Sequence, residues 1–193
     1  MGRPQEFDSD AVIDAALSVF WDRGLHRTSI DDLLNASGLS RSSLYNAYGG
    51  KQSLFEQAVQ RYVDNQVMRL RKILDAPTLK QSLEKLFHGA THDNYEGKGC
   101  LLVNCAGSVM RDDAFEQELL RDAFKRMFAI VEQRIRAAQD VKEISSSIDA
   151  ADAATLICAA LSGLRIFHKS GMQKAKLKKA ADLAINGLLQ QFK

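Results

Sequence analysis

This 193-residue chain is poor in proline and cysteine, and it has no long apolar run. Its 2 prolines, Pro4 and Pro77, leave long stretches in which helices can extend without interruption. Its 3 cysteines, Cys100, Cys105 and Cys158, show no CxxC spacing, so neither a disulfide framework nor a zinc site is indicated. No uninterrupted apolar run approaches the roughly 18 residues that a membrane span needs. No signal peptide opens the chain, so we expect a cytoplasmic protein without a membrane partner.

The sequence motifs of the common enzyme and cofactor classes are also missing. It contains no GxSxG, P-loop or GxGxxG segment. His88 and His92 are four residues apart and would share one helix face, but a third metal ligand is not evident, and metal sites usually need three or four. We therefore expect no enzymatic activity, no cofactor and no metal ion.

Charge argues against a simple nucleic-acid binder. The formal net charge is +2, and residues 1–52 carry five Lys and Arg side chains against seven Asp and Glu side chains. A DNA-binding domain usually shows a basic footprint. An excess of acidic residues is compatible with DNA binding if these carboxylates lie on the outer face of the first helix, away from the DNA groove.

Apolar residues recur with helical spacing along most of the chain, and strands are hard to find, which predicts an all-α fold. The 46% hydrophobic composition is enough for one or two domains with a substantial core. The predicted helices are Asp8 or Asp10 to Arg23, one from about Thr28, one after Ser40, Gln52–Leu74, Thr78–Asn94, a short helix from about Gly99 to Met110, Asp112–Gln139, Ile148–Ser170 and Lys174–Phe192.

The stretch from Thr28 to Lys51 has the pattern of a helix-turn-helix unit at about residues 29–48. Thr28 followed by Asp31 is a weak variant of a capping box and places a helix start at about Thr28. Gly38 supplies the turn, and Ser40 can cap a second helix. Helix, short turn with glycine, helix is the signature of this motif.

In such a unit the second helix lies in the DNA major groove and its first residues meet the base edges. Arg can bind guanine, Asn can pair with adenine, and Ser can serve either. The structural alternative is a pair of packed helices in a helical protein-interaction module without sequence-specific DNA binding. The predicted base-reading residues are Arg41, Ser42, Ser43 and Asn46.

Backbone contacts to the DNA should come from around this helix. The helix N-terminus at Thr28 and Ser29 suits a phosphate, although plain capping explains Thr28 as well. The Tyr45 hydroxyl can bond a phosphate while its ring packs below. Arg3, in a terminal arm, could enter the adjacent minor groove or do nothing.

At these residues the chain resembles the TetR/AcrR family of bacterial transcriptional regulators. The resemblance covers about the first 60 residues, with departures at Ser42, where Gly is frequent, and at Ala47, where His is frequent. It implies phosphate contacts at Thr28, Tyr45 and Lys51. The resemblance is carried by Gly2-Arg3-Pro4, Phe20-Trp21-Asp22-Arg23-Gly24, Thr28-Ser29-Ile30, Ala36-Ser37-Gly38-Leu39-Ser40, Ser43-Leu44-Tyr45, Tyr48, Lys51 and Leu54-Phe55.

The resemblance also implies the overall organisation. We expect an N-terminal three-helix DNA-binding domain at residues 1–52 and a larger helical ligand-binding and dimerisation domain at residues 53–193. The helix Gln52–Leu74 would act as a lever between them. The last two helices are rich in small apolar residues, which suits a four-helix dimer interface made by two chains.

Ligand sensing is predicted in two places. Gly99-Cys100-Leu101 resembles a subgroup that senses electrophiles or oxidants through a cysteine, and a helix N-terminus favours the thiolate; Asn104 and Cys105 follow in the same segment. A buried structural cysteine is the alternative. Phe124, Met127 and Phe128 could line an apolar ligand cavity or belong to an ordinary core.

The chain is therefore predicted to be a homodimeric DNA-binding regulator. Double-stranded operator DNA and a small apolar or electrophilic effector are its expected partners. Repression, relieved by the effector, is what the family resemblance implies.

Overall fold

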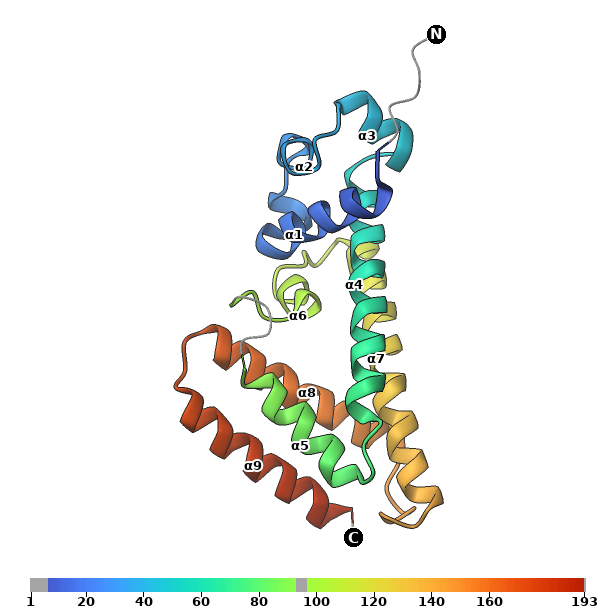
Figure 1. Ribbon diagram of the computed structural model, residues 1–193, viewed down its shortest axis with the longest axis vertical. Coiled ribbons are helices and arrows are strands. Elements are labelled where there is room, and N and C mark those ends of the chain that lie inside the picture. The colour runs from blue at the N-terminus through green and yellow to red at the C-terminus, as the bar shows by residue number, and fades with distance from the viewer. Residues whose placement is uncertain (1–6, 93–96, 193) are drawn as a thin grey trace.

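The computed structural model describes residues 7–92 and 97–192. Within these ranges the chain forms nine helices and no strand, which confirms the all-α prediction (Figure 1). The helices are α1 (Ser9–Arg27), α2 (Ile30–Ser37), α3 (Arg41–Tyr48), α4 (Lys51–Leu74), α5 (Leu79–Ala90), α6 (Leu101–Ala106), α7 (Ala114–Asp140), α8 (Ala150–Lys169) and α9 (Lys174–Gln191).

The molecule is elongated, with α1, α2 and α3 at one end and α5, α8 and α9 towards the other (Figure 1). The long helix α4 connects the ends, because it packs against α1 and α3 near its start and against α5 and α7 further along. Its buried stripe includes Phe55, Val59 and Tyr62, at the helical spacing that the sequence predicts. Phe55 meets Phe20 of α1 edge-on, with ring centroids 5.0 Å apart.

The start of α2 differs from the sequence prediction by one residue. Ser29, not Thr28, is the N-cap, and a full capping box joins it to Asp32 rather than to Asp31. The Ser29 hydroxyl accepts a hydrogen bond from the Asp32 N–H, and the Asp32 carboxylate accepts one from the Ser29 N–H. The hydrogen bonds from the Ser29 backbone and side chain lower the pKa of Asp32.

Thr28 is buried instead, and its hydroxyl donates to the Gly24 carbonyl oxygen at 2.6 Å. Gly24 interrupts α1 with φ 73° and ψ 175°, a conformation that favours glycine. The chain continues in helical turns to Arg27, so α1 does not stop at Gly24 as predicted. This break turns Leu25 into the core and leaves His26 on the surface.

The acidic side chains near the N-terminus are mostly paired with cations. Arg61 of α4 binds Asp10 and Asp14 of α1, and Lys98 binds Asp22. These cations come from outside residues 1–52, so a charge count over that segment alone overstates its acidity. The pairs also tie α1 to α4 and to the segment before α6.

Helix α8 has an unusual exposed apolar face. Among the described residues it is the one helix long and apolar enough to span a membrane by length and composition, with a mean hydropathy of 1.5. Only 33% of that apolar window is buried within the chain. Leu156, Ile166 and Phe167 are at least half exposed, and Leu183 on the neighbouring α9 is 74% exposed. An exposed apolar face of this kind marks an interaction site.

Candidate nucleic-acid interface

Helix α3 presents a polar face at the tip of the molecule. Ser40 caps it by accepting a hydrogen bond from the Ser43 N–H at 3.1 Å, and Gly49 ends it in the left-handed conformation. Leu44 and Tyr48 are buried, as predicted, so the opposite face must look outward. The exposed residues of that face are Arg41, Ser42, Tyr45 and Asn46.

The predicted base-reading side chains are held in small local networks. Arg41 donates to Asp31 of α2 at 2.6 Å, and both side chains are exposed. Ser42 and Ser43 each share a hydrogen bond with the Ser40 hydroxyl, at 3.0 and 2.8 Å. Tyr45 is 47% exposed, and its ring lies over Gly50, where an added Cβ would be 3.5 Å from the ring. The side chains are therefore at the surface and partly oriented before any DNA binds.

Lys51 is engaged with the protein backbone. Its Nζ donates to the Leu25 carbonyl at 2.9 Å and to the Thr28 carbonyl at 2.8 Å, which closes the turn between α1 and α2. An ammonium group has three donors, so one remains for a phosphate.

The predicted phosphate contact of Thr28 is opposed by the geometry. Its side chain is 1% exposed and its hydroxyl proton is already given to Gly24. Ser29 is exposed at the N-terminus of α2, although its hydroxyl serves the capping box. Arg3 lies outside the described residues.

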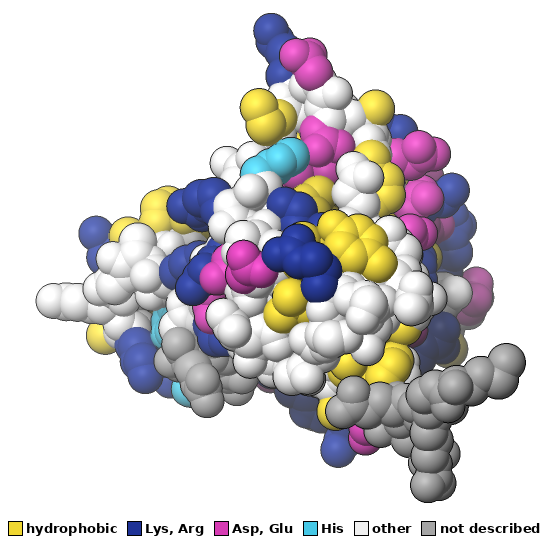
Figure 2. Space-filling model, turned by 90° about the horizontal axis from the view of Figure 1, so that it is seen from above, with side chains coloured by type: hydrophobic (Ala, Val, Ile, Leu, Met, Phe, Trp, Pro, Cys, Tyr) yellow, Lys and Arg dark blue, Asp and Glu magenta, His cyan; other side chains and the backbone are white. Residues whose placement is uncertain are grey.

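Viewed onto the tip of the molecule, Lys and Arg side chains stand in separate groups with acidic side chains among them, and uncoloured polar side chains and backbone fill much of the face (Figure 2). A surface of this kind offers few phosphate-neutralising charges. Its affinity for DNA would therefore depend only moderately on salt.

The predicted sensing cysteines are buried. Cys100 is 3% exposed, caps α6, and its sulfur accepts a hydrogen bond from the Tyr62 hydroxyl at 3.3 Å. Cys105 is 1% exposed, and burial raises its pKa to about 12, with Glu116 adding to the shift. Burial likewise raises the pKa of Cys158 to about 12. Asn104 accepts from Lys169 and donates to the Lys98 carbonyl, so it braces α8 against the segment before α6.

The aromatic and Met residues of α7 contribute to packing. Met127 is buried, and Phe124 and Phe128 contact each other with ring centroids 5.9 Å apart. None of the three lines the hollow that the structure shows between α4, α5 and α8.

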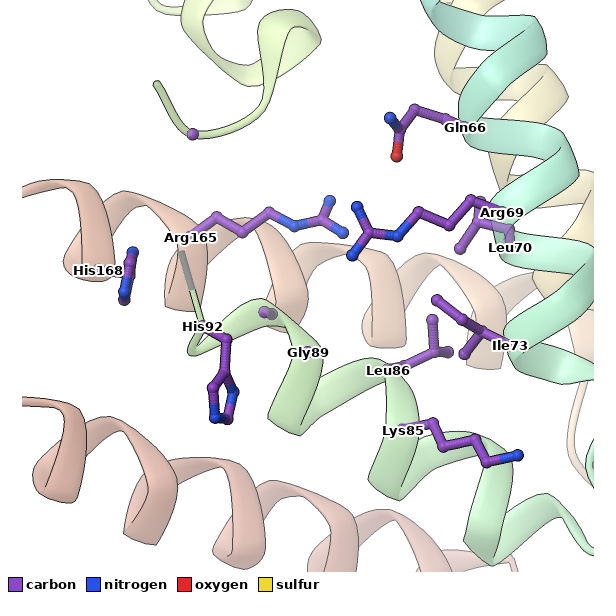
Figure 3. A pocket seen from close by; sticks show the side chains of 12 residues that line it. Gln66, Arg69, Leu70, Ile73, Lys85, Leu86, Gly89, His92, Arg165 and His168 are labelled. Carbon is purple, nitrogen blue, oxygen red and sulfur yellow. The ribbon is translucent and has the colours of Figure 1, made fainter. Parts of the chain in front are cut away.

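That hollow, which we call the α4–α5–α8 hollow, is lined by both charged and apolar side chains. Its interior measures about 40 Å³, and the space rises to about 560 Å³ when the open solvent at its mouth is included. Arg69 of α4 and Arg165 of α8 extend towards each other across it, with Gln66 on one side and Leu86 and Ile73 on the other (Figure 3). No local pattern in the sequence predicts these lining residues, because they come from three separate helices.

A further cluster joins α1 to α7. His26 of α1 lies against Asp113 and Glu116 at the start of α7, about ninety positions later in the sequence. No local spacing predicts it, because its members come from two helices that are far apart in the sequence.

Two models of known protein families match this chain. Residues 12–58 match the family model for bacterial regulatory proteins of the tetR family, and residues 76–183 match the model for tetracyclin repressor-like C-terminal domains. The second match alone covers more than half of the chain.

Three relatives illustrate the similarity. An uncharacterised helix-turn-helix transcriptional regulator of Bacillus subtilis, YezE, is 36% identical over 135 residues, covering 64% of this chain and 70% of that protein. The Escherichia coli transcriptional repressor ComR is 26% identical over 186 residues, covering 93% and 88%.

The third relative is a solved structure. A cysteine-substituted form of the TetR family regulator CifR, in complex with a 26-base-pair operator duplex, superposes with a TM-score of 0.85 at 25% identity, covering 95% of this chain and 98% of that one. The chain therefore belongs to the tetR family of bacterial regulatory proteins and is a DNA-binding transcriptional regulator.

Proposed function

We propose that the chain is a homodimeric repressor whose α3 helices read a pseudo-palindromic operator and release it when an effector binds. Residues 1–52 form the DNA-binding domain, and residues 53–193 form the effector and dimerisation domain. The observation that carries this proposal is the outward face of α3, where Arg41, Tyr45 and Asn46 are exposed together at the tip of the molecule. The names of the relatives add support, since ComR is a repressor and CifR binds operator DNA.

We assign direct readout of the DNA bases to Arg41, Ser42, Ser43 and Asn46. Tyr45 and the third N–H donor of Lys51 contact DNA phosphates. Arg3 is kept as a minor-groove contact from the N-terminal arm, and Ser29 as a helix-terminus contact. Thr28 is excluded from this set, because its buried hydroxyl supports the turn after Gly24.

The second copy covers the exposed face of α8 and α9. Leu156, Ile166, Phe167 and Leu183 would lose their contact with water in a four-helix interface. A two-fold dimer would then place two α3 helices about 34–36 Å apart, one turn of DNA. The small residues Ala159 and Gly163 on the same face of α8 permit close approach of the partner helix.

The effector is a small molecule with an apolar part and an anionic group, bound in the α4–α5–α8 hollow. Arg165 and Arg69 line the hollow and give it a basic character, which suits an anionic group. Leu86 and Ile73 supply the apolar wall. To release DNA, the effector must bind the conformation of the protein that cannot bind DNA more tightly than the conformation that can. Equal affinity for the two conformations would leave their populations unchanged. The regulator would work in the cytoplasm, where its operator is.

Fluorescence anisotropy with the DNA that flanks its own gene tests the proposal. Specific binding of two chains per duplex, well above a scrambled duplex of equal length and with a modest salt dependence, is the expected result. No binding at low salt to any duplex would support the alternative of a helical protein-interaction module.

The effector is tested on the same complex with a medium-chain fatty acid and its neutral amide. Arg165→Gln should abolish release by the anionic compound. Release by the amide alone would contradict the anionic assignment.

A further inference from the structure

The end of α1 meets the start of α7 through three side chains that could bind a cation. The His26 Nε2 atom lies 3.0 Å from Oε2 of Glu116 and 3.2 Å from Oδ2 of Asp113. The three potential ligand atoms all lie within 4.8 Å of one another. His26 belongs to the proposed DNA-binding domain and the two acids to the effector domain, so the cluster bridges them.

The cluster contains a buried oxygen that the protein does not satisfy. The side chain of Glu116 is 1% exposed, and its second oxygen, Oε1, accepts no hydrogen bond from any residue that the structure describes. A buried carboxylate oxygen without a donor is costly.

We propose that His26, Asp113 and Glu116 bind one divalent transition-metal cation of the zinc type and thereby fasten the DNA-binding domain to the effector domain. Around a tetrahedral cation, with bonds of about 2.0–2.2 Å, neighbouring ligand atoms stand roughly 3.3–3.6 Å apart. The two distances from His26 are a few tenths of an ångström shorter, so the side chains would move apart slightly to admit the ion. One imidazole with two carboxylates suits zinc, manganese, cobalt or nickel.

The ligands are positioned by the local structure. Asp113 is the N-cap of α7: its Oδ1 accepts the Glu116 N–H at 2.8 Å, which leaves Oδ2 facing His26. On the other side, the positive φ of Gly24 breaks α1 and directs the following turn towards α7. An added Cβ at Gly24 would already lie 3.6 Å from the Ser108 hydroxyl, so the two parts approach closely there. His26 is 37% exposed on the side chain, which gives a cation access.

A plain histidine–carboxylate pair is the simpler alternative, and the chain contains one for comparison. His88 lies 2.7 Å from Asp182, with one carboxylate that is half exposed. The His26 cluster differs by its second carboxylate and by the buried, unsatisfied oxygen of Glu116. Those two differences are what a cation would require and an ion pair would not.

Metal titration of untagged, chelator-stripped, full-length protein tests the site. Calorimetry with Zn²⁺ and absorption spectroscopy with Co²⁺ should show one ion per chain. His26→Gln and Glu116→Gln should lose saturable binding, and Asp113→Asn, which keeps a capping side chain, should weaken it more than about tenfold. His88→Gln is the matched control and should bind like the wild type.

Circular dichroism and thermal melting of each variant establish that it is folded. Absence of saturable binding by the wild type would overturn the proposal. Binding that persists in folded His26→Gln and Glu116→Gln, or a strong thiolate-to-cobalt absorption band, would also overturn it, because the ligands would then lie elsewhere.

The consequence for regulation rests on the proposed function. A cation that bridges the two domains should change operator affinity, and operator DNA should change metal affinity by the same factor. We expect at least a fivefold change in operator affinity on Zn²⁺ addition in the wild type and none in His26→Gln. Equal affinity with and without bound Zn²⁺ would refute the coupling. If no operator is bound at all, the proposed function fails, while the metal titration still tests the site.

Discussion

Arg41 Nη2 lies 2.6 Å from the Asp31 Oδ1, so the arginine proposed to read a base is already paired with a carboxylate of the preceding helix. Both side chains are more than half exposed, and such a pair contributes little to stability. Its main effect should be on the affinity for DNA, because Asp31 competes with the bases for Arg41 and places a negative charge near the DNA phosphates.

Asp31→Asn should therefore strengthen operator binding by about two- to fivefold, which is what the release of an exposed ion pair can supply. Anisotropy titrations at constant salt measure this change. Glu84→Gln, which removes a carboxylate from an exposed pair on α5, is the control and should leave the affinity unaltered. A weaker complex of Asp31→Asn would show that Asp31 orients Arg41 for reading.

Lys51→Met should lower the stability of the protein as well as its affinity for DNA. The Leu25 and Thr28 carbonyls lose their shared donor, which costs on the order of 1–3 kcal/mol and lowers Tm by several degrees. Differential scanning calorimetry measures the shift, with the exposed Lys80→Met as the control. An unchanged Tm together with weakened DNA binding would mean that Lys51 serves the phosphate alone.

Gly24→Ala should destabilise the protein by about 1 kcal/mol or more, since a side chain at φ 73° is strained whatever space surrounds it. Gly89→Ala in α5 makes a matched control: an added Cβ there meets nothing within 4 Å, and alanine favours a helix. Urea unfolding of both variants gives the comparison. Equal stability of Gly24→Ala and the wild type would show that the turn adapts to a side chain.

Phe167→Glu should convert the proposed dimer into a monomer and weaken operator binding, because a carboxylate would be buried without a partner in the proposed α8–α9 interface. Sedimentation velocity measures the mass. Met68→Glu changes a comparably exposed apolar residue on α4 and should remain dimeric. A dimeric Phe167→Glu would place the interface on another face.

The Cys158 thiol should react slowly with iodoacetamide at pH 8. Its pKa, raised to about 12 by burial, leaves a thiolate fraction roughly three orders of magnitude below that of an ordinary cysteine. The rate should rise with pH up to that pKa, since only the thiolate attacks. Mass spectrometry of tryptic peptides follows each cysteine separately. Rapid labelling of Cys158 in the native protein at pH 8 would contradict the raised pKa.

Local sequence was sufficient to locate the helices, apart from the end of α1, and to predict the outward face of α3. The buried positions Leu44 and Tyr48 and the turn at Gly38 follow from helical periodicity and from glycine's access to positive φ. The one-residue error at the start of α2 arose because two adjacent hydroxyl residues, each followed three positions later by an aspartate, make equally good capping boxes. Only the packing of Thr28 under Gly24 decides between them.

The contacts that charged and buried side chains make could not be predicted from the local sequence. Lys51 appears solvated in sequence, yet it binds two carbonyls of a turn 23 and 26 residues earlier. The acids of α1 appear unneutralised until Arg61 and Lys98 are seen beside them.

The sequence by itself determined the helices, the helix-turn-helix unit and the family, because these depend on short-range spacing. Only the tertiary structure decided where side chains from distant helices meet. It brought Arg69 and Arg165 together across a hollow and placed His26 against Glu116, 90 residues away. Such sites depend on the directions in which packed helices cross, and no local pattern of residues records those directions.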